Sequence, residues 1–143
     1  MTASKQEQYI ELALDEEYYA IRIQDVQEII RMQPITAIPG SPAHVKGVIC
    51  LRGEVVSVIG LRELFGMPAK LPSKDTRIVM VKHAETFVGV IVDRIHKVTV
   101  YNSIQVPPQG KAGGPSGCLT GIGLGDDRMA GLLNTEQLWL TPS

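Results

Sequence analysis

The chain has 143 residues, of which 44% are apolar and 20% are charged, and its formal net charge is −1. Such a composition is ordinary for a folded globular protein and leaves room for one domain or two small subdomains. Aromatic residues make up only 5% and the basic residues are scattered, which argues against a protein that reads nucleic acid or binds an anionic membrane.

Short strand-like runs account for most of the chain. They have the length and the branched or alternating apolar residues that favour β-strands, and turn residues lie between them. In chain order, the predicted strands are residues 9–14, 18–23, 45–51, 55–59, 77–83, 87–92, 95–100, 104–106, 119–124 and 129–133. Residues 107–117, rich in proline and glycine, are predicted to form a surface loop.

Three short segments are predicted to be helical. Residues 25–31 are expected to form a helix in which Asp25 is the N-cap and Glu28, three residues on, completes a capping box. Residues 61–65 and 134–139 each predict about one helical turn. Between the two apolar runs before residue 61, Gly53 can supply the positive φ of a tight hairpin turn.

The second half of the chain repeats the pattern of the first. When Gly47 is aligned with Gly121 and both are read forward, apolar residues meet apolar residues without a gap. Residues 20–23 match residues 89–92 at a slightly smaller offset. A chance match of two hairpins rich in valine and glycine is the alternative. A true repeat predicts two small β-units, which must pack together because neither can bury a generous core alone.

The sequence contains no recognisable catalytic or metal-binding pattern. His44, His83 and His96 have no second histidine or cysteine at ligand spacing, and the carboxylate clusters fall at predicted turns. Cys50 and Cys118 lie among apolar residues without CxxC spacing, so we expect reduced, buried thiols. We therefore predict that the protein is not an enzyme and has no cofactor or metal.

The location expected from the sequence is the cytoplasm. No apolar run reaches the roughly 18 residues that a membrane-spanning helix needs. The polar start MTASKQEQ lacks the apolar core of a signal peptide.

The segment VKGVICLRG at residues 45–53, followed by VIGLR at 58–62 and FG at 65–66, resembles the signature of the CheW family of bacterial chemotaxis coupling proteins. Further matches occur at residues 19–21, 26–30, 35–39, 88–93 and 119–128. Because the resemblance covers nearly the whole chain, we expect one CheW-like domain over residues 7–141. It would divide into halves at about 7–76 and 77–141, between which strands can be exchanged.

The resemblance implies a mainly β fold of two SH3-like five-stranded β-barrels packed together, with short helices. It implies a non-catalytic adaptor that couples chemoreceptors (methyl-accepting chemotaxis proteins) to a CheA-type histidine kinase in two-component signalling. The partners would be the cytoplasmic hairpin tip of a receptor and the regulatory domain of the kinase. The adaptor would join receptor arrays on the inner face of the membrane through these partners, without inserting into it.

Carried over residue by residue, the resemblance assigns Val26, Glu28 and Arg52 to a receptor-facing groove between the barrels. Gly47 and Gly53 would be the residues of the signature that shape this segment of the chain. Simpler roles stay open from the residues alone: core packing for Val26, helix capping for Glu28 and a solvated turn for Arg52. No pattern assigns residues to the kinase-facing surface.

Three signature positions differ from the usual family pattern, since Cys50, Ser57 and Gly60 replace Asn, Pro and Asp. These changes suggest a variant partner, as in twitching motility or surface sensing instead of flagellar chemotaxis. A free-standing small-barrel module that binds a ligand is a less favoured alternative.

Overall fold

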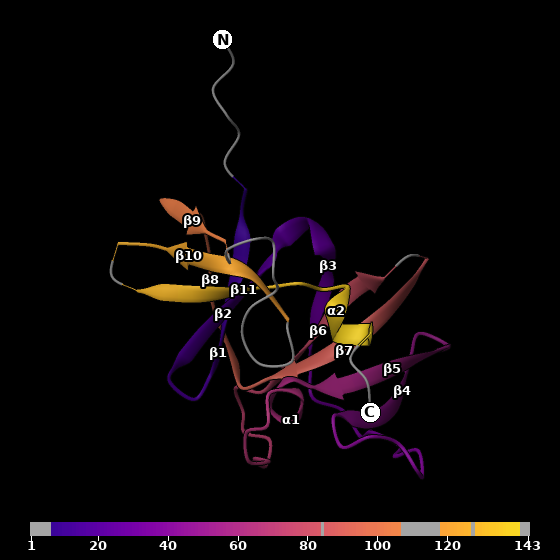
Figure 1. Cartoon of the computed structure of the whole chain (residues 1–143). Coiled ribbons are helices and arrows are strands. Elements are labelled where there is room, and N and C mark those ends of the chain that lie inside the picture. Colours follow the sequence, from indigo (N-terminus) through magenta and orange to yellow (C-terminus); the bar gives the residue numbers. More distant parts are fainter. Residues whose placement is uncertain (1–6, 84, 107–117, 127, 141–143) are drawn as a thin grey trace.

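The computed structural model describes residues 7–83, 85–106, 118–126 and 128–140, so the loop expected at 107–117 lies outside the described residues. Two β-sheets, on the left and right of Figure 1, contain most of the described chain. The terminal sheet has the order β8 (Arg94–Thr99), β1 (Tyr9–Leu14), β2 (Glu17–Arg22), β11 (Met129–Leu133), β10 (Leu119–Leu124) and β9 (Ser103–Gln105). The middle sheet has the order β3 (Val26–Arg31), β6 (Arg77–His83), β7 (Thr86–Val92), β5 (Glu54–Gly60) and β4 (Val45–Leu51). Short helical turns are η1 (Ile23–Asp25), α1 (Leu61–Leu64) and α2 (Gln137–Leu140).

The two sheets do not follow the order of the chain. The first hairpin, β1–β2, joins the late strands β8–β11, whereas the five strands between them form the middle sheet. Strands from before and after residue 76 therefore contribute to both sheets. The prediction of a mainly β fold with two units is confirmed, although one sheet has six strands instead of five.

The internal repeat is visible in the strand pairing. β5 runs parallel to β7, with Ser57 opposite Val88, and β11 runs parallel to β2, with Gly131 opposite Tyr19. Ser57 corresponds to Gly131 and Val88 to Tyr19 in the aligned repeat. The same register thus occurs in both sheets, which confirms that the repeat is structural.

The helix predicted for residues 25–31 is wrong. Only Ile23–Asp25 form a single 3₁₀ turn, and Val26–Arg31 are strand β3, which pairs antiparallel with β6. The capping box is therefore absent, and Glu28 is a strand residue. Val26, Ile29 and Ile30 are β-branched and favour a pleated strand, and the ladder with β6 outweighs the local capping pattern.

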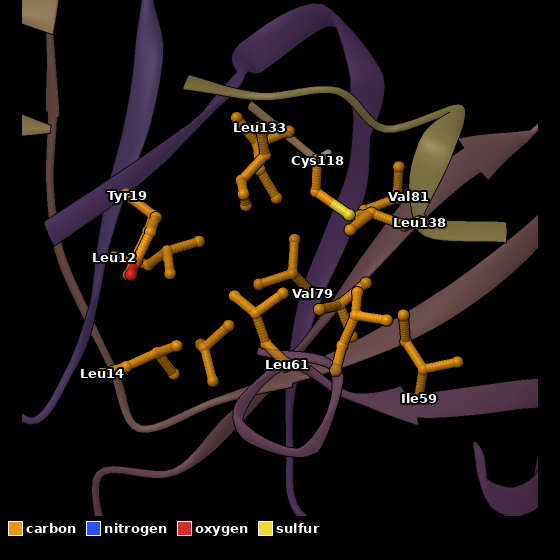
Figure 2. Packing of buried hydrophobic residues seen from close by; sticks show 14 residues of the cluster. Leu12, Leu14, Tyr19, Ile59, Leu61, Val79, Val81, Cys118, Leu133 and Leu138 are labelled. Atoms are coloured by element: carbon orange, nitrogen blue, oxygen red, sulfur yellow. The ribbon is translucent and has the colours of Figure 1, made fainter. Parts of the chain in front are cut away.

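The two sheets share one apolar core. This central core contains side chains of β1, β2 and β11 from the terminal sheet and of β5, β6 and β7 from the middle sheet (Figure 2). Leu61 and Leu64 of α1 and Leu138 of α2 are also buried in it. Separate smaller clusters lie inside each sheet, around Tyr101 in the terminal sheet and Met80 in the middle sheet. Strands such as β6 are consequently buried on both faces and read as continuous apolar runs.

Polar contacts at one edge of the central core also join the sheets. Arg62 of α1 donates to Asp93, after β7, at 2.7 Å and to Asp15, between β1 and β2, at 3.2 Å. The backbone N–H of Asp15 donates to the same Asp93 carboxylate at 2.8 Å. The hydrogen bond from Arg62 lowers the pKa of the Asp15 carboxyl below its usual value.

The two cysteines have different environments. Cys118 is buried in the central core as expected, but Cys50 is exposed, so the prediction of two buried thiols is wrong for Cys50. Cys50 lies on β4 opposite Val55, which is 71% exposed, on a part of the middle sheet that nothing else in the described chain covers. Neither cysteine forms a disulfide.

Gly47 is required by a close backbone approach. Its φ is +139°, and a Cβ there would lie 2.0 Å from the carbonyl oxygen of Thr36. The counterpart Gly121 faces the carbonyl oxygen of Gln105 in the same way, at 2.6 Å from an added Cβ. In each sheet, the residue that supplies this carbonyl pairs with the residue that follows the glycine: Thr36 with Val48, and Gln105 with Ile122. Gly47 therefore lets the segment around Thr36 pair closely with β4.

Replacement of Gly47 should cost more stability than replacement of Gly53. Gly53 also has a positive φ, +84°, but nothing lies within 4 Å of an added Cβ. Gly53→Ala should lower the free energy of unfolding by about 1 kcal/mol through backbone strain alone. Gly47→Ala adds a clash with fixed backbone and should cost about 3 kcal/mol or more. Urea unfolding of both variants measures the difference, and equal losses would exclude the contact with Thr36 as the reason for the glycine.

A buried carboxylate lies inside the terminal sheet. Glu11 of β1 is only 1% exposed, and its two oxygens accept a hydrogen bond from the Tyr101 hydroxyl at 2.6 Å and interact with Nδ1 of His96 at 2.7 Å. Burial, together with the hydrogen bond to Glu11, raises the pKa of Tyr101 far above its usual value. The tyrosine is therefore a neutral donor that satisfies a carboxylate removed from water.

Loss of the Tyr101 hydroxyl, which donates to Glu11, should destabilise the protein. We expect Tyr101→Phe to lower the free energy of unfolding by about 1–3 kcal/mol, because a buried carboxylate loses a partner. Tyr9→Phe is the matched control, since the Tyr9 hydroxyl makes no hydrogen bond with another residue that the structure describes. The raised pKa of Tyr101 also predicts that its stabilising contribution is complete below about pH 10 and is lost at higher pH. Chemical denaturation between about pH 7 and 11 tests both statements, and equal losses in the two variants would contradict the role of Tyr101.

Candidate functional site

A two-residue turn joins β4 to β5 and projects from the middle sheet. Arg52 and Gly53 have φ values of +50° and +84°, and Leu51 and Glu54 on either side face each other in the hairpin. Positive φ at both central residues is the geometry of the type I′ turn, which matches the twist of the flanking strands. The turn leaves the Arg52 side chain 67% exposed.

Arg52 forms an ion pair with Glu28. Glu28 lies on β3 and Arg52 follows β4, and these strands are the two opposite edges of the middle sheet. Their contact shows that the sheet curls enough to bring these two ends of its edges within side-chain reach, as in a small barrel. The ion pair therefore lies at one mouth of this curled sheet, where it is open to solvent.

A pocket of about 290 Å³ lies beside the ion pair. We call it the first pocket; it is lined by Gln27, Glu28, Leu51, Arg52, Glu54, Val56, Met80 and Phe87. Its floor is apolar and its rim is charged, a combination suited to a protein segment with one apolar side chain and polar flanks. All these residues belong to the middle sheet or its turn, whereas the sequence led us to expect a groove between two barrels.

Val26 does not face the first pocket. The pairing of β3 with β6 shifts register between Val26 and Glu28, so Val26 lies opposite Val81 and Glu28 opposite the next residue, Met80. Val81 points into the central core and Met80 into the middle sheet's own cluster, and Val26 packs against the central core. Because of this bulge, Val26 and Glu28 point to opposite faces of β3 although they are only two residues apart. The structure thus brings together Glu28 and Arg52 but not Val26.

Sequence reasoning missed Phe87, Met80 and Glu54 as pocket residues. Phe87 and Met80 read as ordinary strand residues, and their place in the pocket depends on how the sheet curls. Glu54 flanks the predicted turn directly, and that position was the one signal that could have identified it.

No catalytic or metal centre is apparent in the described part of the chain. No group of three or more His, Cys, Asp or Glu residues there could hold a metal ion. His96 contacts the carboxylate of the buried Glu11. None of the described helices is long and apolar enough to span a membrane.

Two duplicated sheets around a shared core, with an ion pair at the mouth of one of them, define a duplicated β scaffold. The chain belongs to the CheW-like domain family, whose sequence pattern matches residues 8–140. The resemblance seen in the sequence is therefore confirmed.

Named relatives and a solved structure agree with this family. The chain is 34% identical over 132 residues to the chemotaxis protein CheW of Helicobacter pylori, covering 92% of this chain and 80% of the relative. It is 27% identical over 95 residues to the protein PilI of Pseudomonas aeruginosa, covering 64% and 53% of the two chains. A crystal structure of the scaffolding protein TtCheW from Thermoanaerobacter tengcongensis superposes with a TM-score of 0.81 at 34% identity, covering 90% and 89%. The predicted CheW-like fold is thus confirmed.

The ion pair at the first pocket should contribute little to stability. Its side chains are 67% and 30% exposed, and exposed pairs of this kind are typically worth about 1 kcal/mol or less. We expect Arg52→Ala and Glu28→Gln each to change the free energy of unfolding by less than about 1 kcal/mol. A loss of several kcal/mol in thermal or urea unfolding would mean that the pair closes the sheet and is not available to a partner.

Proposed function

We propose that this protein is a non-catalytic adaptor that couples chemoreceptors to a CheA-type histidine kinase. The observation that carries the proposal is that Glu28 and Arg52, which the family signature assigns to receptor binding, meet at the rim of one apolar-floored pocket. Membership of a family whose relatives are named chemotaxis and scaffolding proteins supports it. The protein would act in the cytoplasm, at receptor arrays on the inner face of the membrane.

The chemistry of the first pocket suits the tip of a receptor's helical hairpin. The planar Arg52 guanidinium can donate several hydrogen bonds to carboxylates or carbonyls on a helix surface, and Glu28 can hold it in position. Met80 and Phe87 offer an apolar floor that an inserted side chain can desolvate. A net charge of −1 provides little long-range steering, so we expect association to depend on shape and apolar contact.

The other residues assigned by the family signature belong to the same proposal. Gly53 permits the turn that presents Arg52, and Gly47 fixes the other end of β4. Val26 would contribute indirectly, through the central core behind β3. The regulatory domain of the kinase would dock elsewhere.

The pathway is a separate question. The likeness to a protein named PilI, as well as to chemotaxis proteins, keeps open a chemosensory pathway other than flagellar chemotaxis. Pull-down of the full chain with receptor cytoplasmic fragments and kinases encoded in its own genome tests both the function and the pathway. We expect retention of one receptor class and its kinase, and retention of neither would contradict the adaptor role.

Reversal of the charge of Arg52 should weaken receptor binding without unfolding the protein. We expect Arg52→Glu to reduce affinity for the receptor fragment by roughly tenfold or more. The glutamate cannot donate the charge-assisted hydrogen bond to the receptor, and it is repelled by the neighbouring Glu28. Arg31→Glu, an equal charge change at an exposed position at the end of β3, is the matched control. Unchanged affinity in Arg52→Glu, or equal losses in the two variants, would remove Arg52 from the receptor surface.

A further inference from the structure

The bulge in β3 brings one extra residue to the rim of the first pocket. The ladder with β6 pairs Val26 with Val81 and Glu28 with the next residue, Met80. Gln27 therefore has no partner of its own in β6. At such a bulge, two residues of one strand face a single residue of the other. Gln27 and Glu28 indeed both line the first pocket with Met80, so β3 presents two adjacent polar side chains there.

The repeat places the same bulge in the terminal sheet. The pairing of β8 with β1 shifts register between Glu11 and Leu12, which leaves His96 of β8 without a partner in the ladder. In the aligned repeat, His96 corresponds to Gln27. The bulge thus belongs to the duplicated backbone, and the side chain that it carries is what differs between the two sheets.

The two bulged side chains also differ in what lies opposite them. In the terminal sheet, Nδ1 of His96 lies 2.7 Å from the carboxylate of Glu11. The residue that corresponds to Glu11 in the middle sheet is the apolar Met80. Gln27 is exposed, and its side-chain amide makes no hydrogen bond with any residue in the part of the chain that the structure describes. The amide is therefore available to a group from outside the chain.

The chemistry of an amide limits what the Gln27 side chain can select. It has two N–H donors and a carbonyl acceptor, and it carries no charge. The main-chain groups in the body of a helix are already bonded within that helix, so a docked helical segment meets Gln27 with a side chain. A polar side chain can form a hydrogen bond with the amide. An apolar side chain would bury the amide without a partner, which is the stronger source of discrimination.

We propose that Gln27 is a specificity-determining residue of the first pocket, and that its amide hydrogen-bonds a polar side chain of the docked receptor tip. The inference rests on the proposed receptor role of this pocket and adds a rule of selection to it. Met80 and Phe87 accept the apolar part of the docked segment, whereas Gln27 requires a polar side chain beside that part. A receptor tip with an apolar side chain at this place should bind roughly tenfold more weakly.

The side-chain amide of Gln27 can be observed directly by NMR. The isotope-labelled full chain is titrated with the receptor cytoplasmic fragment that it retains in the pull-down. We expect the NH₂ signals of Gln27 to shift until the protein is saturated. Gln24 is an internal control, since it is exposed in η1 and does not line the first pocket, and its NH₂ signals should stay in place.

A matched pair of variants tests whether the hydrogen bond contributes to affinity. Gln27→Met keeps the length and flexibility of the side chain but removes the amide's donors and its acceptor. We expect it to weaken binding of the receptor fragment by roughly fivefold, and Gln24→Met to change affinity by less than about twofold. Both side chains are exposed, so both variants should unfold at the same urea concentration as the parent protein.

The outcomes separate this inference from the proposed function. A complex that forms without a shift of the Gln27 amide, or with equal affinities of the two methionine variants, would overturn the role of Gln27 and leave the adaptor role in place. Earlier unfolding of Gln27→Met alone would show that the amide serves the fold, and would also overturn the inference. A parent protein that binds no receptor fragment would overturn both.

Discussion

The burial of one apolar core between two sheets is the constraint on which the rest of the structure depends. Each sheet consists of short strands, and a unit of this size buries too little surface to be stable alone. Leu12 and Tyr19 from the terminal sheet pack in the same cluster as Val79 and Val90 from the middle sheet, and α1 and α2 add further leucines (Figure 2). The first hairpin crosses to the sheet of the late strands, so the chain cannot separate into two consecutive folding units.

Duplication supplies one backbone geometry twice, and the side chains give each copy its own chemistry. The glycines at 47 and 121, each covered by a crossing carbonyl, and the matching parallel strand pairs keep the two backbones alike. At corresponding positions of the repeat, however, one sheet has Met80 and the other a buried Glu11 with hydrogen-bonded partners.

The sequence predicted features that depend on local chemistry or on the repeat. The strand runs, the Arg52–Gly53 turn and the paired sheets all follow from residue type and spacing. Prediction failed where distant strands decide the outcome. Val26–Arg31 carry a plausible capping pattern, yet pairing with β6, much later in the chain, makes them a strand. The bulge that turns Val26 away from Glu28 leaves no trace in the residue pattern, and the exposure of Cys50 depends on where the central core ends. The meeting of Glu28 with Arg52 depends on the curling of a whole sheet.

The most direct measurement of the shared core is urea unfolding of the full chain followed by NMR, with amide signals from both sheets recorded in the same samples. If one core holds both sheets, signals from β1 and β10 must disappear at the same urea concentration as those from β5 and β7, in one cooperative transition. Survival of the middle sheet's signals after those of the terminal sheet are lost would show that the sheets are stable separately, and would contradict a core on which both depend.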